Sequence, residues 1–176
     1  MLAQRSGGFT LIEVLVATVV LVIGLLGVAG MQLVSFQNNQ SAYLRTQATF
    51  IAAEFIDRMR ANASGHRAAV YDAIDIDSID DVPSDQLCIS STAGCSASQL
   101  ANQDIREWAA NFWNVYAVAD YKPTLPQGRA VVARDTANNE YRVTVFWQER
   151  GWSTEDGSIA RADAIERYVQ LRTVLR

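Results

Sequence analysis

The sequence contains only one lysine, Lys122, and one histidine, His66, and this scarcity excludes several kinds of site. A P-loop needs a lysine after a glycine-rich run, and no such run precedes Lys122. A metal site built on two histidines cannot form within one chain. The net charge of −4 gives none of the basic character that direct nucleic-acid binding requires. We therefore expect no nucleotide, metal or nucleic-acid site of these types.

Cysteine is also scarce, since Cys88 and Cys95 are the only two. Zinc would need four ligands, and no second pair of cysteines or histidines supplies them. Two interpretations stay open: a small disulfide loop in an oxidising compartment, or two unpaired thiols in a surface loop. We favour the disulfide and predict no cofactor.

Charge is almost absent from residues 9–34, where Glu13 is the only charged side chain. About 20 apolar residues span a bilayer as a helix, so this run is long enough to cross a membrane. It is not an ordinary secretory signal, because the small residues Gly7 and Gly8 precede the run instead of following it. Arg5 also precedes it, so the positive-inside rule places the N-terminus in the cytoplasm and the bulk of the chain in the periplasm.

Glu13 is the anomaly in this apolar helix, because a carboxylate at the centre of a bilayer costs about 2.5–3.5 kcal/mol. It is either functional, or it lies near the headgroups and extends its carboxylate towards water. Gly24, Gly27 and Gly30 follow at a spacing of three. They predict a smooth face for close helix packing, or alternatively a helix made flexible by glycine.

The segment Gly8-Phe9-Thr10-Leu11-Ile12-Glu13 resembles the leader junction of type IV prepilins and pseudopilins. The resemblance implies that a prepilin peptidase and methylase cleaves between Gly8 and Phe9 and N-methylates Phe9. It also implies that Glu13 is needed for methylation and filament assembly. Cleavage would leave a protonated amino group on Phe9 that can pair with the buried Glu13 of a neighbouring subunit, which would set the register between helices.

Beyond residue 34 the pattern becomes amphipathic. Apolar residues at spacings of three and four predict that the helix continues to about Asn62, with Gly65 as its C-cap. They are Leu44, Ala48, Ile51, Phe55 and Met59. The expected organisation is a leader at 1–8, a membrane or filament-core helix at 9–34, an amphipathic helix at 35–62 and a periplasmic globular domain at 63–176.

Two stretches of the amphipathic helix, 39–48 and 55–62, resemble PilV-type minor pilins and one class of type II secretion pseudopilins. Many major pilins carry a proline near the position of Gly30, and this sequence does not. The resemblance therefore implies a minor pilin that helps to initiate assembly with other minor pilins and the major pilin.

Residues 66–97 read as a loop region that contains His66 and an acidic run. The run comprises Asp72, Asp75, Asp77, Asp80, Asp81 and Asp85. A calcium site is one interpretation, although the EF-hand pattern fails at Ile79 and Asp80. A solvated acidic surface is the interpretation that we favour.

A second helix is predicted over 98–120, with Ser98 as N-cap and an aromatic stripe that indicates core packing rather than a binding cage. Strands are predicted at 129–134, around 141–148 and at 169–175, with a hairpin turn at 135–139 and a longer loop at 149–162. The fold class is α+β, a long helix packed on a small antiparallel sheet. Type IV pilins share this plan.

No catalytic constellation stands out, so we predict that the chain is no enzyme but the substrate of the peptidase and methylase. The predicted function is that of a minor pilin in the inner membrane and the pilus, which serves twitching motility and adhesion. The alternatives are a type II secretion pseudopilin and a pilus-tip adhesin. No direct nucleic-acid partner and no small-molecule substrate are predicted.

Overall fold

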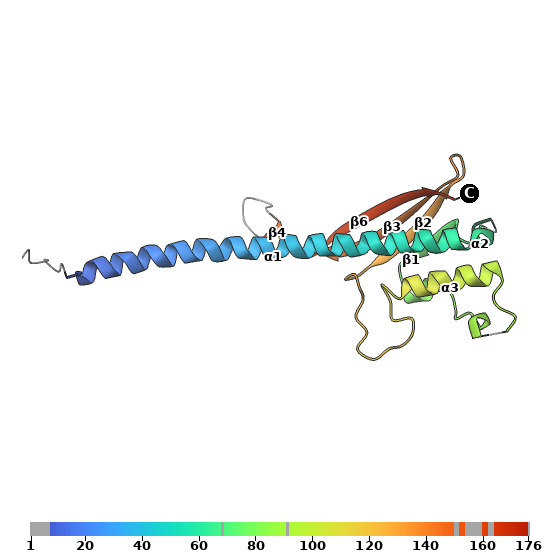
Figure 1. Ribbon diagram of the computed structural model, residues 1–176, viewed down its shortest axis with the longest axis horizontal. Coiled ribbons are helices and arrows are strands. Elements are labelled where there is room, and N and C mark those ends of the chain that lie inside the picture. The colour runs from blue at the N-terminus through green and yellow to red at the C-terminus, as the bar shows by residue number, and fades with distance from the viewer. Residues whose placement is uncertain are drawn as a thin grey trace, which may run out of the picture. The chain divides into compact units, whose positions relative to one another are not determined.

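The computed structural model describes residues 8–67, 69–90, 92–149, 152–153, 160–161 and 164–175. The chain divides into two compact units, Met1–Gln40 and Ser41–Arg176, which are described one at a time. Figure 1 labels the main elements. In chain order they are α1 (Leu11–Ala61), α2 (Ala63–Arg67), β1 (Ala73–Ile76), η1 (Ile79–Asp81), η2 (Leu87–Ser90), α3 (Ala97–Ala109), β2 (Arg129–Asp135), β3 (Glu140–Glu149), β4 (Trp152–Ser153), β5 (Ala160–Arg161) and β6 (Ile165–Val174).

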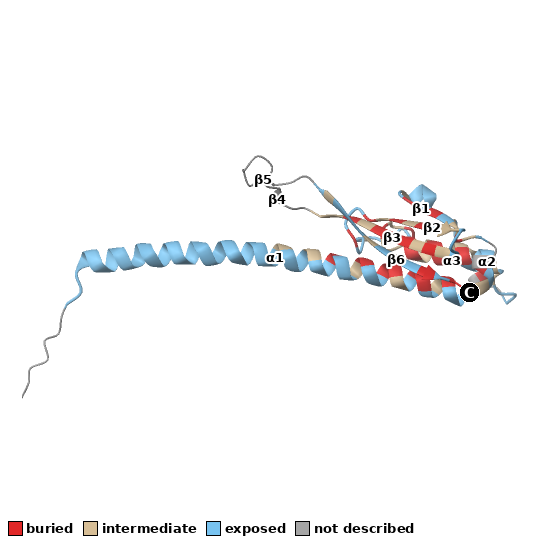
Figure 2. Ribbon diagram, turned by 90° about the horizontal axis from the view of Figure 1, so that it is seen from above, coloured by how far each residue is buried: buried red, intermediate tan, exposed pale blue. Residues whose placement is uncertain are grey.

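The first unit consists of the apolar part of α1, whose side chains are almost all exposed (Figure 2). An apolar segment can leave water only if its backbone hydrogen bonds are satisfied internally, which a helix achieves. The hydroxyl of Thr18 is satisfied in the same way, since it donates to the carbonyls of Val14 and Leu15 at 3.0 and 2.8 Å. Within the described residues, α1 is the one helix that is long and apolar enough to cross a membrane.

The remainder of α1 belongs to the second unit and buries one face there. The predicted face is confirmed, because Leu44, Ala48, Ile51, Phe55 and Met59 are all buried. This part of α1 contacts both α3 and the sheet. The indole of Trp108 on α3 donates to the carbonyl of Ile51 at 3.0 Å, and Arg60 donates to the hydroxyl of Thr173 on β6 at 2.9 Å.

The sheet of the second unit has four antiparallel strands in the order β1-β2-β3-β6. A tight hairpin joins β2 to β3, as predicted, and Asp135 pairs opposite Glu140 at its closed end. β3 pairs with β6 along its full length, from Glu140 opposite Val174 to Glu149 opposite Ile165. The α+β plan of a long helix packed on a small antiparallel sheet is therefore confirmed.

The core lies between α1, α3 and the inner face of the sheet. Tyr141, Val143, Val145 and Trp147 on β3 are buried, which is the alternation expected of a strand with one face covered. Figure 2 shows the buried residues in red along β3, α3 and the second part of α1. The aromatic stripe of α3 belongs to this core, since Trp108 stacks on Phe55 with ring centroids 4.0 Å apart.

Several predicted boundaries after α1 were wrong. The long helix ends at Ala61, within one residue of the predicted end, but Gly65 is not its C-cap. Gly65 lies in the short helix α2, and the side chain of Asn62 accepts from its amide at 3.0 Å, which caps α2. α2 also holds His66, which was expected in a loop. The segment 66–97 contains the strand β1, which alternates exposed and buried residues over only four positions.

The second helix is shorter than predicted and begins at a different cap. Ser96 rather than Ser98 accepts from the amide of Gln99, and α3 ends at Ala109. Phe112 and Val115 continue the apolar spacing beyond it and are buried, but they lie in turns. Residues at helical spacing can therefore be buried outside a helix, because tight turns direct their side chains into the same core. The predicted loop at 149–162 contains the two short paired strands β4 and β5.

Candidate processing and assembly site

Gly8, Phe9 and Thr10 precede α1 and are exposed. Phe9 is 81% exposed, although a phenylalanine is usually buried. A Cβ atom added at Gly8 would meet nothing within 4 Å. The peptide bond between Gly8 and Phe9 is thus open to another protein. Of the predicted leader, residues 1–7 lie outside the described residues.

Thr10 fixes the beginning of α1, because its side-chain oxygen accepts from the amide of Glu13 at 3.3 Å. This is an N-cap, and a threonine three residues before a glutamate is the sequence pattern of a capping box. This role of Thr10 was not predicted, although the Thr-x-x-Glu spacing is a sequence signal for it. The cap places the Glu13 carboxylate in the first turn, where the positive end of the helix dipole favours it.

The three predicted packing glycines lie along the exposed, apolar part of α1. A Cβ atom added at Gly24, Gly27 or Gly30 would meet nothing within 4 Å. Each glycine costs helix stability of roughly 1 kcal/mol relative to alanine, so three of them in one helix are unfavourable unless the helix gains something from them. Close approach of another helix is the gain that small residues allow in a membrane.

Two sequence models of protein families match the chain, and they adjoin each other. The model described as the prokaryotic N-terminal methylation motif matches residues 3–29, which include the exposed junction and the first turns of α1. The model of the type IV pilin Tt1218 matches residues 30–106. The chain belongs to the type IV pilin family. No curated protein and no solved structure matches it significantly.

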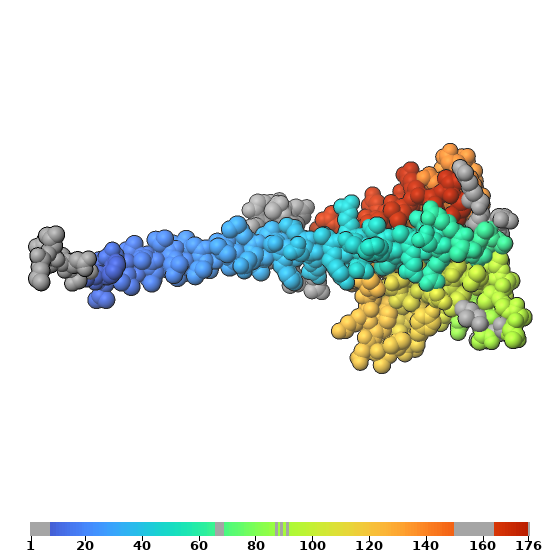
Figure 3. Space-filling view, in the orientation of Figure 1, coloured from blue at the N-terminus to red at the C-terminus, as the bar shows by residue number. Residues whose placement is uncertain are grey.

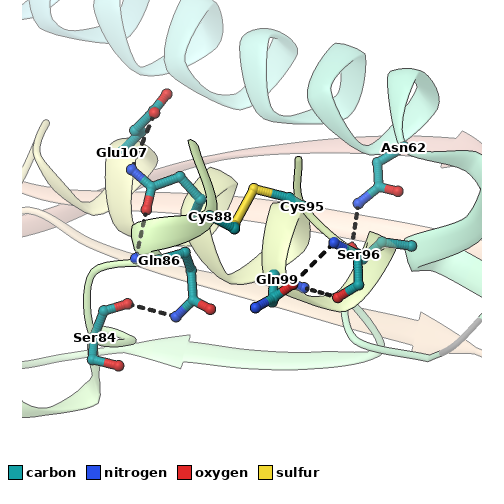
Figure 4. The surroundings of a disulfide bond; sticks show 10 residues. Asn62, Ser84, Gln86, Cys88, Cys95, Ser96, Gln99 and Glu107 are labelled. Carbon is teal, nitrogen blue, oxygen red and sulfur yellow. Dashed lines mark hydrogen bonds between the residues drawn. A yellow bond between two sulfur atoms is a disulfide. The ribbon is translucent and has the colours of Figure 1, made fainter. Parts of the chain in front are cut away.

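In this pilin, Cys88 and Cys95 form a disulfide between η2 and the beginning of α3. Figure 4 shows the bond among the polar contacts of this region. On one side, the amide of Gln86 donates to the side chain of Gln103 at 3.2 Å. On the other side, Asn62 donates to the carbonyl of Ala97 at 2.8 Å. The disulfide loop is thereby attached to α3 and to the end of α1.

A buried polar network joins the end of α1 to α3. Asn62 donates to the hydroxyl of Tyr71 at 3.1 Å, and this hydroxyl donates to Asp104 at 2.7 Å. Burial raises the pKa of Asp104, and the hydrogen bond from Tyr71 partly opposes that effect. Arg58 lies 3.5 Å from Asp104 and 2.6 Å from Glu107. This network was not predicted from the sequence, because its members meet only in the fold.

The acidic run does not form one cluster. Asp72 pairs with Arg134 at 3.1 Å, while Asp81 accepts from the amide and hydroxyl of Ser78, both at 2.8 Å. Among the described residues, no three side chains of histidine, cysteine, aspartate or glutamate are placed to hold a metal ion. The ion pair with Arg134 explains the position of Asp72, and the turn at Ser78 explains that of Asp81.

Proposed function

We propose that this chain is a minor pilin that helps to initiate and assemble type IV pili. The observation that carries the proposal is the match to the N-terminal methylation motif over residues 3–29, at the beginning of an exposed apolar helix. Pilins are structural subunits, so the part assigned to this chain is assembly and not catalysis. The motif implies processing by a prepilin peptidase and packing against other pilins.

In this proposal the peptidase cleaves between Gly8 and Phe9 and the methylase modifies Phe9. The amino group of Phe9 then pairs with Glu13 of the neighbouring subunit, because either charge left alone in an apolar environment is costly. Gly24, Gly27 and Gly30 allow the helices of adjacent subunits to approach closely. Thr10 holds Glu13 in the first helical turn, near the amino group that it must meet.

The proposed organisation is a leader at 1–8, a membrane and filament-core helix at 9–34, its amphipathic continuation at 35–62 and a globular domain at 63–176. The helix crosses the inner membrane once and the domain faces the periplasm. The disulfide between Cys88 and Cys95 supports this placement, since disulfides persist in oxidising compartments.

A minor rather than a major role is favoured by the sequence around Gly30, which lacks the proline that many major pilins carry there. The PilV-like stretches 39–48 and 55–62 support the same assignment, with other minor pilins and the major pilin as partners. Twitching motility and adhesion would depend on the chain through the pili that it helps to build.

A deletion strain tests the assignment when it is scored for surface pili and for secreted enzymes of the type II system. We expect pili and twitching to be lost while secretion stays normal. Loss of secretion with normal pili would assign the chain to the pseudopilins instead. Normal pili and normal secretion would contradict both assignments.

The role of Glu13 has its own test, in which Glu13→Ala is compared with the charge-conserving Glu13→Asp. We expect Glu13→Ala to accumulate in the membrane but to be missing from sheared filaments, whereas Glu13→Asp retains more incorporation. Immunoblots of the sheared filaments and of the membranes measure, for each variant, the ratio of filament protein to membrane protein. Normal incorporation of Glu13→Ala would exclude the pairing with Phe9.

A further inference from the structure

Residues 35–41 are the stretch of α1 between the apolar run at 9–34 and the buried face that begins at Leu44. Residues 35–40 are exposed apart from the partly exposed Gln37, so they gain little from packing. The boundary between the two compact units also falls here, between Gln40 and Ser41. Figure 3 shows the part of α1 that follows, in cyan to green, packed beside α3.

The composition of this stretch disfavours a helix. Serine and asparagine side chains hydrogen-bond to nearby backbone groups and so compete with the helical hydrogen bonds. Four such residues lie within seven positions, namely Ser35, Asn38, Asn39 and Ser41. Most helical stability in a protein comes from tertiary packing, and an exposed stretch without it opens locally at low cost in free energy. α1 is helical here, but its sequence and exposure make this a weak part of the helix.

A hydrogen bond from Ser41 holds the end of this stretch that adjoins the second unit. The hydroxyl of Ser41 donates to the carboxylate of Glu149 at 2.9 Å, across 108 positions of the sequence. Within the described residues, Ser41 is the first residue of α1 whose side chain bonds to another element. Leu44, about one turn later, is the first buried residue of the helix. The bond from Ser41 therefore marks the point where the sheet begins to hold α1.

Glu149 is itself fixed in place by the core. It is the last residue of β3, and its other carboxylate oxygen accepts from the indole of Trp147 at 2.6 Å. Trp147 lies two positions earlier on the same face of the strand and is only 2% exposed. The two oxygens of the carboxylate are thus engaged by different parts of the fold, one by the core and one by α1.

The environment of the Glu149 carboxylate makes these hydrogen bonds important. The side chain is 12% exposed, and a charge so far removed from water is costly unless hydrogen bonds compensate it. Arg167 lies 3.9 Å away, but its side chain is 55% exposed, and an ion pair of that kind stabilises little. Trp147 and Ser41 consequently supply most of the compensation, and loss of either donor leaves a carboxylate oxygen poorly satisfied.

We propose that residues 35–41 act as a joint in α1 and that Glu149 is the positioning residue that clamps the joint at Ser41. With the clamp closed, α1 continues as one helix into the second unit. With the clamp open, the turns between residue 35 and Leu44 unwind or bend, while the apolar run and the core keep their structure. The inference depends only on the fold and stands independently of the minor-pilin assignment.

Hydrogen exchange of the full chain in lipid nanodiscs, followed by mass spectrometry, tests whether the joint exists. The amide of each helical residue bonds to the carbonyl four positions earlier, so amides 39–45 report on residues 35–41. We expect these amides to exchange faster than amides 52–59, which lie in the packed part of α1. Equal protection of the two ranges would mean that α1 has no joint and would overturn the proposal.

Ser41→Ala tests the clamp with a change of opposite sign to that expected from helix propensity. Alanine is the better helix former, so without a clamp the substitution would slow the exchange of amides 39–45. Loss of the clamp should instead speed it about tenfold, which corresponds to about 1.4 kcal/mol for a hydrogen bond to a charged group. Unchanged or slower exchange in Ser41→Ala overturns the clamp.

Thr46→Ala is the matched control for this substitution. The hydroxyl of Thr46 is exposed and donates to the carbonyl of Ala42 within α1 at 2.9 Å, so its loss leaves the contact with β3 intact. We expect the same amides to exchange at an unchanged or lower rate in Thr46→Ala. An acceleration equal to that of Ser41→Ala would mean that any lost hydroxyl on α1 has this effect, and the clamp would be wrong.

Substitutions at Glu149 test the other partner of the bond. A glutamine can accept from Trp147 with its oxygen and donate to the Ser41 oxygen with its nitrogen, so Glu149→Gln should stay within about threefold of the wild-type exchange rate. Glu149→Ala should speed the exchange about tenfold. The double variant Ser41→Ala/Glu149→Ala should exchange no faster than Glu149→Ala alone, because the two residues form one contact. Accelerations that multiply in the double variant overturn the pairing.

Protection of the β3 amides in the same experiment shows whether each variant is folded. If Glu149→Ala is not folded, Glu149→Ser replaces it, because serine is polar but too short to reach Ser41. If Glu149→Gln exchanges as fast as the shortened variant although it is folded, the amide does not restore the contact, and the role assigned to the hydrogen bonds of Glu149 is wrong.

Discussion

Tyr71 and Tyr141 are buried phenols that each donate to a carboxylate, Tyr71 to Asp104 and Tyr141 to Asp72, both at 2.7 Å. Burial is the main cause that raises the pKa of both, and for Tyr141 the value reaches about 12. A phenol whose pKa is higher in the folded state adds stability that is fully present below the unfolded value of about 10. This stability is lost as the pH rises through the folded pKa.

We therefore predict that the free energy of unfolding of the full chain in detergent falls steeply between about pH 10 and pH 12. Tyr141→Phe should lower stability at pH 8 by about 1 kcal/mol, because the bond to Asp72 is lost, but should flatten the alkaline decline. Denaturant titrations followed by tryptophan fluorescence measure both effects. Parallel declines of the two proteins would contradict the role of Tyr141.

Phe55 and Phe50 offer a second comparison at single-residue scale, because both lie on α1 within the second unit. Phe55 is fully buried and stacks on Trp108, whereas Phe50 is 67% exposed. We predict that Phe55→Ala lowers the free energy of unfolding by about 3–5 kcal/mol, while Phe50→Ala changes it by less than about 0.5 kcal/mol. Similar losses from both, in the same denaturant titrations, would mean that the buried face is assigned wrongly.

At the scale of elements, α3 shows how one cap decides where a helix begins. Ser96 and Ser98 both precede the apolar stripe, but only Ser96 forms the reciprocal pair with Gln99, at 3.3 and 3.0 Å. Cys95 immediately precedes this cap, so the disulfide fixes both the end of the 88–95 loop and the beginning of α3.

Ser96→Ala should consequently lower the free energy of unfolding by about 1 kcal/mol. Ser98→Ala is the matched control and should be neutral or slightly favourable, because alanine is the better helix former inside α3. Thermal unfolding of the two variants, with the disulfide kept oxidised, gives the comparison. If Ser98→Ala lowered the free energy of unfolding more than Ser96→Ala does, Ser98 would be the cap.

At the scale of the whole molecule, one chain combines an apolar exposed helix with a domain that has its own core. The unmatched apolar surface of residues 9–34 is stable only in a membrane or against other apolar helices. The match to the methylation motif covers residues 3–29, and the processing site that we propose lies at the beginning of that segment, where Gly8 and Phe9 are exposed.

We predict that protein recovered from filaments begins at N-methylated Phe9 and lacks residues 1–8. Gly8→Val should block cleavage and leave the full chain in the membrane, because the added side chain lies at the bond to be cut, whereas Gly7→Ala should be processed. Mass spectrometry of the N-terminal peptide distinguishes the three proteins. Cleavage at any other bond would exclude the proposed junction.

The sequence by itself determined the features that depend on local pattern. The long helix follows from the apolar run and the spacing of Leu44 to Met59, and the β2–β3 hairpin follows from alternation around a turn. The family resemblance was carried by six consecutive residues, Gly8 to Glu13, and the motif match confirmed it. These signals are strong because they are periodic or contiguous.

Only the tertiary structure decided features that depend on distant partners. β1 is too short to show a period, and it is a strand because Ile74 pairs opposite Val132 and is buried against the core. The end of α3 was mispredicted because turns bury Phe112 and Val115 as a helix would. The network of Asn62, Tyr71 and Asp104 joins residues that no sequence period connects.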